Sequence, residues 1–337
     1  MMIDMLSETQ KKQYTEYLLF RSFYTGFEPH ESVLDVLPKV NSIKIAEEII
    51  KSKLDCLTSP AILLSSGMDS ASILPYVSKQ TKAFTILHEG DRFSEVEIAK
   101  EYCLKYKIEH EVIMINSSDY LSSINALMKN KKMPLSPAEP IFYLASKHIA
   151  SQGYTEIITG GGADTKQGGF ARFRGDCSVD EIIKKYEKKY LKARSILKES
   201  VNPDYVFENY LKQVEGKLVV NSRKILAEIG VERFAFDNAI TFGGCAHVAP
   251  YSEFLFEFDE ERNLLEPKYM ISNLFEHNYG MLPPKKIAMQ KPPDALRFFL
   301  PKTQIFKSID FRKLNFPQVF LIYSLDLWHH QEVCNEF

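Results

Sequence analysis

LSSGMDS, residues 64–70, follows a short apolar run of the kind that forms a buried strand. Its small residues at positions 65 to 67 would let the backbone approach a bound phosphate, and its serine hydroxyls can donate hydrogen bonds. A helix starting at about Asp69 would add unpaired backbone N–H groups and the positive end of its dipole. The same pattern also fits an ordinary turn in which Asp69 and Ser70 only cap the helix, so both interpretations stand at this point.

Outward from this turn, predicted strands alternate with predicted helices. Apolar runs predict strands at 61–65, 83–88, 111–115 and 155–159. Helical patterning separates them, for example over 94–106. Strands joined in this way form right-handed crossovers on one parallel sheet, so the predicted fold class is α/β with a doubly wound parallel sheet.

The composition of the chain changes after about residue 175. Charged residues at helical spacing fill 179–200 and favour a solvated amphipathic helix over a nucleic-acid-binding face. Helical patterning continues to a terminal helix at about 320–330. A mostly helical C-terminal lobe is therefore expected. The predicted domains are a lead-in at 1–57, a phosphate-binding α/β domain at 58–175 and a helical lobe at 176–337, which completes the substrate site.

A second candidate turn follows the last of these strands. It reads TGGGADTKQGGF, residues 159–170, and surrounds Asp164 with glycines. Because the carboxyl ends of parallel strands meet at one edge of a sheet, Asp69 and Asp164 are expected to converge there. Two carboxylates suit a Mg²⁺ ion that bridges the phosphates of a nucleotide. The candidate ligands are Leu64, Ser65, Ser66, Gly67, Asp69 and Ser70 in the first turn and Gly160, Gly161, Gly162 and Asp164 in the second, with Asp69 and Asp164 as metal ligands.

Together the two turns carry a family resemblance. SSGMDS resembles the SGGxDS loop, and GGGADTKQGGF resembles the GEGADE-type motif, of the PP-loop ATP pyrophosphatase superfamily. Within it, the chain is similar to the synthetase domain of asparagine synthetases, and to the related β-lactam synthetases and lasso-peptide cyclases. Segments outside the turns add to the likeness. PHESVLDVLPKV resembles the linker before that domain, Asp237 with PYSE at 250–253 resembles its D…PFLD segment, and SLDLWHH resembles its ending.

The resemblance implies an activity that uses ATP and Mg²⁺. A substrate carboxylate, on a small molecule or a peptide, attacks the α-phosphate of ATP and gives an acyl-adenylate and pyrophosphate, and an amine then displaces AMP. Lys291, in IAMQKPP, lies near the position of the family's basic residue, whose ammonium stabilises charge developing on the phosphate. The register leaves open whether Lys291 is catalytic or an ordinary surface lysine.

The chain also departs from the family pattern. Asparagine synthetases carry Glu at the position of Gly161, and alignment on Pro250 puts Ala246 where β-lactam synthetases have a second acid. Adjacent His247 is either a substitute general base or a buried, hydrogen-bonded histidine. Ser66 replaces a loop glycine, so it is expected in a backbone conformation that other residues adopt.

Nitrogen supply is a further expected difference. The chain begins Met1-Met2 and not with the cysteine nucleophile of a glutaminase domain, so no such domain is expected. The amine would come from free ammonia, from a separate protein or from the substrate itself. Glutamine alone is therefore expected to fail as nitrogen donor, and aspartate is expected to be a poor acyl substrate.

Composition excludes several other classes of protein. A net charge of −2 gives no electrostatic footprint for nucleic acid or a membrane surface, and no apolar run approaches the length of a membrane span. Five scattered cysteines without a CxxC indicate neither a disulfide framework nor a zinc site, which favours the reducing cytoplasm. Arg172 and Arg174, just beyond the second turn, could reach pyrophosphate, but a surface position is expected for both. Two rival interpretations stay open, a degenerate nucleotide-binding partner protein and another PP-loop enzyme such as a tRNA-modifying one.

Overall fold

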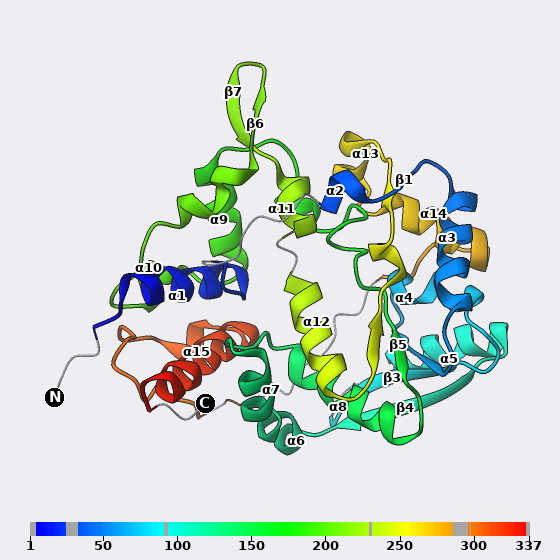
Figure 1. Cartoon of the computed structure of the whole chain (residues 1–337), viewed down its shortest axis with the longest axis horizontal. Coiled ribbons are helices and arrows are strands. Elements are labelled where there is room, and N and C mark those ends of the chain that lie inside the picture. The colour runs from blue at the N-terminus through cyan, green and yellow to red at the C-terminus, as the bar shows by residue number, and fades with distance from the viewer. Residues whose placement is uncertain are drawn as a thin grey trace.

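The computed structural model contains a parallel sheet, which lies in the lower right part of Figure 1. The structure describes residues 5–24, 33–90, 94–228, 231–285, 296 and 298–334. Within them the sheet has the strand order β4-β3-β2-β5-β8, and every neighbouring pair is parallel. The strands are β2 (Pro60–Leu63), β3 (Lys82–His88), β4 (Glu109–Ile115), β5 (Glu156–Ile158) and β8 (Ala246–Val248).

Helices cover both faces of this sheet, which confirms the predicted α/β class. Side chains alternate between the faces, so that Ala61 and Leu63 join one buried cluster and Ile62 and Leu64 join the other. The first cluster is covered by α1 (Glu8–Phe20), α6 (Ser117–Ser122), α7 (Ile124–Lys131), α8 (Glu139–Ser151), α12 (Val231–Phe242) and α15 (Phe316–Cys334). The second is covered by α3 (Ile43–Asp55), α4 (Met68–Ala71), α5 (Ser94–Tyr106) and α14 (Tyr269–Tyr279).

The helix after the first turn is shorter than the sequence pattern indicates. α5 occupies the predicted residues 94–106, but α4 makes only one turn before a 3₁₀ segment, η1 (Leu74–Tyr76). Pro75 has no N–H to donate and its ring excludes the preceding turn of α-helix, so the α-helix cannot continue through it. A single turn carries little dipole, and the expected contribution of a helix dipole to this turn is correspondingly small.

The residues after 175 are mostly helical, as predicted, but they also complete the sheet. β8 lies at its edge beside β5, and a hairpin of β6 (Leu211–Val214) and β7 (Lys217–Val220) projects from the body at the top of Figure 1. The helix predicted over 179–200 breaks into α9 (Val179–Lys189) and α10 (Ala193–Ile196). The domain boundaries at 57 and 175 stay a prediction.

The remaining elements frame the second turn and the chain end. They are α2 (Val33–Val36), β1 (Lys39–Val40), η2 (Ala171–Phe173), η3 (Pro203–Tyr210), α11 (Ser222–Glu228), η4 (Pro250–Ser252), β9 (Leu255–Phe256), α13 (Glu260–Leu265) and η5 (Phe311–Lys313). The predicted terminal helix is α15. None of the helices in the described ranges has both the length and the apolar character that crossing a bilayer requires.

Candidate functional site

The structure brings Asp69 and Asp164 together at the carboxyl edge of the sheet, with a lysine between them. The ammonium of Lys268 lies 2.7 and 2.8 Å from the two carboxylate oxygens of Asp69. The same nitrogen lies 2.8 Å from Oδ1 of Asp164. Lys268 immediately precedes α14 and takes the left-handed backbone conformation, with φ of 60°. The strand-end geometry predicted from the motifs thus comes with a cation that no motif indicated.

Lys268 is a buried positive charge. Only 7% of the residue is exposed, and burial by itself lowers the pKa of an ammonium group. The charges of Asp69 and Asp164 outweigh burial and hold the pKa of Lys268 above its ordinary value. Lys268 is therefore the protonated partner of both carboxylates. Because it is separated from Asp69 by 199 positions in the chain, no local pattern could reveal this contact.

The carboxylate pair fits a Mg²⁺ ion. Oxygens of Asp69 and Asp164 both lie within 2.8 Å of the ammonium nitrogen of Lys268, so the two side chains converge on one cation, as the ligands of one metal ion would. Mg²⁺ characteristically binds one or two protein carboxylates and completes its shell with water and substrate phosphates. Among the residues that the structure describes, no cluster of three or more acidic, histidine or cysteine ligands offers a rival metal site.

The backbone N–H groups of the first turn are held by nearby side-chain oxygens. The N–H of Ser65 donates to the hydroxyl of Ser70 at 3.0 Å, and the N–H of Gly67 donates to Oγ of Ser65 at 3.2 Å. The N–H of Ser66 donates to Oε1 of Glu95, on α5, at 3.3 Å. These donors already point at oxygen atoms, which is the geometry that phosphate binding would use.

Ser66 and Leu64, also in this turn, are both buried. Ser66 does not have a positive φ, which confirms the backbone conformation expected for it, and it is 1% exposed. Its hydroxyl makes no hydrogen bond within the described part of the chain. Leu64 continues strand β2, because its N–H donates to the carbonyl of Phe84 at 2.8 Å and its carbonyl accepts from Thr85.

The second turn packs directly against the first. A β-carbon added at Gly160 would lie 2.8 Å from Cβ of Asp69 and 2.9 Å from the backbone nitrogen of Ser70, which are closer than real contacts allow. Gly162 has a φ of +87° and lies against Ser252. The glycines therefore let the two turns touch, and this contact sets the distance between their aspartates.

We predict that Gly160→Ala lowers stability and weakens the ATP binding that the two motifs lead us to expect. The added methyl group must push the backbone of the first turn away from β5, and overpacking of this kind costs about 1–3 kcal/mol. Gly161→Ala is the milder matched comparison, because its new β-carbon would meet side-chain atoms of Thr159 and Ala249 at 3.1 and 3.3 Å and no backbone atom below 3.0 Å. Calorimetric titration with ATP and urea unfolding measure both effects. Equal losses in the two variants would contradict the contact.

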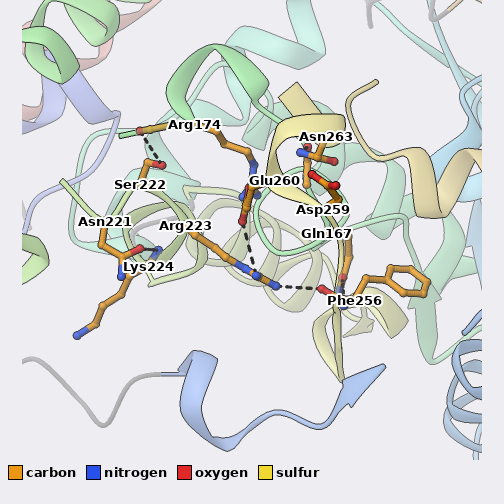
Figure 2. A network of polar contacts seen from close by, with 12 residues as sticks. Gln167, Arg174, Asn221, Ser222, Arg223, Lys224, Phe256, Asp259, Glu260 and Asn263 are labelled. Carbon is orange, nitrogen blue, oxygen red and sulfur yellow. Dashed lines mark hydrogen bonds and ion pairs between the residues drawn. The ribbon is translucent and has the colours of Figure 1, made fainter. Parts of the chain in front are cut away.

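Several long-range hydrogen bonds hold the second turn in place. Gln167 donates to the carbonyls of Tyr251 and Phe254, and its Oε1 accepts from the N–H of Phe256 at 2.9 Å. Figure 2 shows Arg223 beside this contact, donating to the carbonyl of Phe256 at 2.9 Å and pairing with Glu260 at 3.6 Å. Asn263, on α13, donates to the carbonyl of Gly168 at 2.8 Å, so β9 and α13 both anchor the turn that carries Asp164.

Arg174 contributes from inside the protein. It is 3% exposed, so the surface position expected for it is wrong. Its Nε donates to the carbonyl of Gly169 at 2.7 Å, next to Asp164, and burial lowers the pKa of Arg174 to about 10. The GGF sequence is followed by a 3₁₀ turn, η2, which ends at Arg174 and directs its side chain back to Gly169.

His247 forms a hydrogen-bonded chain with two neighbours. Its Nδ1 lies 2.6 Å from Oδ1 of Asp237, on α12, and its Nε2 lies 2.8 Å from Oγ1 of Thr159. A carboxylate only accepts, so Nδ1 carries a proton; when the ring is neutral, Nε2 accepts from the threonine hydroxyl. Oγ1 of Thr159 in turn accepts from the N–H of Gly161 at 3.1 Å. The imidazole is thereby fixed against the second turn, with its side chain 7% exposed.

The strand geometry distinguishes His247 from Ala246. Neighbouring residues of a strand face opposite sides, and Val248 belongs to the cluster under α3 and α14. Ala246 therefore faces that side, whereas His247 faces α12 and the ring of Phe236, 6.0 Å away between centroids. A β-carbon at Gly161 would lie 3.6 Å from Cε1 of His247. The side chain that reaches the second turn from β8 is thus the histidine.

Lys291 lies outside the described residues.

Taken together, these features define a parallel α/β protein with two glycine-containing strand-end turns and a carboxylate pair between them. The chain belongs to the asparagine synthase family, whose model matches residues 47–235. This confirms the family resemblance carried by the two turns. A curated relative is asparagine synthetase [glutamine-hydrolyzing] 1 of Bacillus subtilis strain 168, with 24% identity over 168 residues. The match covers 48% of this chain, and the chain spans about a quarter (26%) of that relative.

Similar solved structures include three proteins. One is an NH3-dependent NAD synthetase from Campylobacter jejuni, with a TM-score of 0.27 and 15% identity over 40% of this chain and 59% of that chain. The U34-tRNA thiolase NcsA from Methanococcus maripaludis has a TM-score of 0.29 and 13% identity over 82% of this chain and 86% of that chain. An NMN synthetase from Francisella tularensis has a TM-score of 0.23 and 15% identity over 74% of this chain and 99% of that chain. TM-scores this low assign neither an activity nor a site to this chain.

Proposed function

We propose that this chain binds ATP with Mg²⁺ at its two strand-end turns, activates a carboxylate as an acyl-adenylate and forms an amide. The observation that carries the proposal is the convergence of Asp69, Asp164 and Lys268 beside both turns. Membership of the asparagine synthase family supports it. A carboxylate is a poor acyl donor. Transfer of AMP from ATP to the carboxylate releases pyrophosphate, and AMP is then the leaving group when the amine attacks.

The residues around the carboxylate pair supply the electrostatics of the first step. Asp69 and Asp164 would hold Mg²⁺, which neutralises charge on the phosphates when it is bound. Lys268 supplies a buried positive charge beside them; its ammonium now lies between the two carboxylates, and Mg²⁺ held by both would displace it from that position. The N–H and hydroxyl donors of Ser65, Gly67 and Ser70 lie together in the first turn, where they would exchange their present partners for phosphate oxygens. Lys291 is proposed as a further cation on its sequence position alone.

The second step requires an amine that has lost its proton. His247 is the proposed general base, with Nε2 taking the proton either directly or through the hydroxyl of Thr159. Asp237 positions the ring and stabilises the imidazolium that results. The amine source is proposed to be ammonia, a separate protein or the substrate.

We predict that His247→Gln slows amide formation about 100-fold or more and leaves adenylation intact. Glutamine retains hydrogen-bonding capacity but cannot accept a proton at neutral pH. Amide product is measured by mass spectrometry, and adenylation is measured as carboxylate-dependent exchange of labelled pyrophosphate into ATP. His277→Gln is the control, because that histidine side chain is 64% exposed. A matched loss of exchange and amide formation in His247→Gln would refute the proposed division of roles.

Pyrophosphate exchange in the wild type tests the proposed function as a whole. Exchange that requires both Mg²⁺ and a carboxylate is the expected result. Calorimetric binding of ATP without exchange, for every acid in a broad panel, would favour a degenerate nucleotide-binding protein over an enzyme.

A further inference from the structure

A cavity of about 290 Å³ opens beside the proposed site. Asp164 lies on its wall, and so does Phe236, whose ring packs against His247. The cavity therefore adjoins Asp164, one of the two residues proposed to hold the metal, and the ring of Phe236 separates it from His247, the residue proposed to take the amine proton. Its volume is close to the lower end of the range for small-molecule sites, about 300–1,000 Å³.

The lining of this cavity favours an apolar or aromatic body. The rings of Phe142 and Phe236 are tilted against each other at 4.3 Å between centroids, and both line the cavity. Phe170 and Tyr190 add two more rings. These residues come from α8, α12, the second turn and the end of α9, so elements distant in sequence build one surface.

Two cations reach the same cavity from the ends of α1 and α9, which lie with α15 at one end of the molecule (Figure 1). The guanidinium carbon of Arg21 lies 4.8 Å from the centre of the Tyr190 ring, and the ammonium of Lys189 lies 6.0 Å from it. Neither cation pairs with a carboxylate in the described ranges. Nε of Arg21 is buried and has no hydrogen-bond partner among those residues.

The positive charges of Arg21 and Lys189 also repel each other. Partial burial and the positive charges of Arg172 and Arg21 lower the pKa of Lys189. Like charges gathered on one wall destabilise the folded chain unless an anion offsets them. The planar guanidinium on Tyr190 presents N–H donors in the fixed geometry that suits an oxyanion.

We infer that the cavity holds an acyl substrate with a second anionic group, an apolar or aromatic dicarboxylate whose second carboxylate pairs with Arg21 and Lys189. The inference rests on the proposed function and deepens it by naming the substrate class. The reacting carboxylate is then the one next to Asp164, and the apolar body lies among the rings between.

Matched acids test this preference. The probes are 3-phenylpropanoate, 3-(4-carboxyphenyl)propanoate, its 4-phosphono analogue and its 4-aminomethyl analogue, each assayed by pyrophosphate exchange and by calorimetric titration. The diacid is expected to show at least about a tenfold higher kcat/KM for exchange than the monoacid. The aminomethyl acid is expected to have the lowest kcat/KM. The phosphonate shows whether Arg21 and Lys189 accept any oxyanion or prefer a carboxylate.

Arg21→Gln is expected to lower the ratio of kcat/KM for the diacid to kcat/KM for the monoacid toward one. Lys189→Gln should act in the same direction. Lys12→Gln is the control, since Lys12 also lies on α1 over a tyrosine ring but is exposed and away from the cavity. Exchange with equal efficiency for monoacid and diacid would overturn the inference and leave the proposed function standing. Arg21-dependent binding of the diacid without exchange would support the anion site while contradicting the proposed function.

Discussion

Asp164→Asn is expected to reduce carboxylate-dependent pyrophosphate exchange by roughly 100- to 1,000-fold. The substitution keeps the shape of the side chain but removes its negative charge. Mg²⁺ then has a single carboxylate, Asp69, and the triphosphate is poorly neutralised. Lys268 keeps its contact with Asp69, so the fold should survive. Exchange is measured with saturating Mg²⁺ and ATP, and the free energy of unfolding is measured in urea.

Asp176→Asn serves as the control for this variant. Asp176 forms an exposed ion pair with Lys212 at 2.8 Å, in which both side chains are more than 40% exposed, and such pairs contribute about 1 kcal/mol or less. It should leave exchange unchanged. Asp164→Asn with wild-type exchange would show that this carboxylate does not take part in ATP use.

Lys268→Met is expected to cost about 3–5 kcal/mol of unfolding free energy in the absence of divalent ions. Methionine fills a similar volume, but the two carboxylates, with side chains only 16% and 22% exposed, then face each other without a cation. Millimolar Mg²⁺ should restore part of the loss, since it can take the place of the ammonium. Wild-type stability should respond much less to Mg²⁺ without ATP.

A second substitution keeps this prediction testable if the variant folds poorly. Asp69→Asn combined with Lys268→Met removes one charge of each sign and should recover stability without Mg²⁺. Lys53→Met is the surface control, because its ion pair with Glu253 at 2.8 Å is about 40% exposed on both sides. A loss in Lys268→Met that Mg²⁺ does not change would contradict metal binding by the carboxylate pair.

The sequence predicts the parts of this fold that local patterns encode. Helix α5 has its predicted bounds because its residues repeat at helical spacing, and strands β2 and β3 are short apolar runs between helices. β8 is not predicted from the sequence, because its three residues, Ala246–Val248, are too few to show the alternation of apolar and polar residues that marks a strand. Its place in the sheet depends on pairing with β5, which is a long-range property.

The candidate site divides in the same way. The motifs indicate Asp69 and Asp164 because each follows a strand in a characteristic turn. Lys268 has no local signal, and its role depends on where α14 begins relative to those turns. Asp237 is ten positions from His247, on a different element, so only the packing of α12 on β8 reveals their hydrogen bond. Contacts between distant segments are what the sequence pattern leaves undetermined.

Oxygen transfer from the acid to AMP is the most direct test of adenylation by this chain. The acid carries ¹⁸O in its reacting carboxylate, and the reaction contains the wild-type protein, ATP, Mg²⁺ and ammonia, with aspartate, 3-phenylpropanoate and 3-(4-carboxyphenyl)propanoate assayed separately. Attack on the α-phosphate predicts AMP that contains one ¹⁸O atom and pyrophosphate that contains none. Label in orthophosphate together with ADP, or ATP binding without transfer of label from any of the acids, would contradict the proposed reaction.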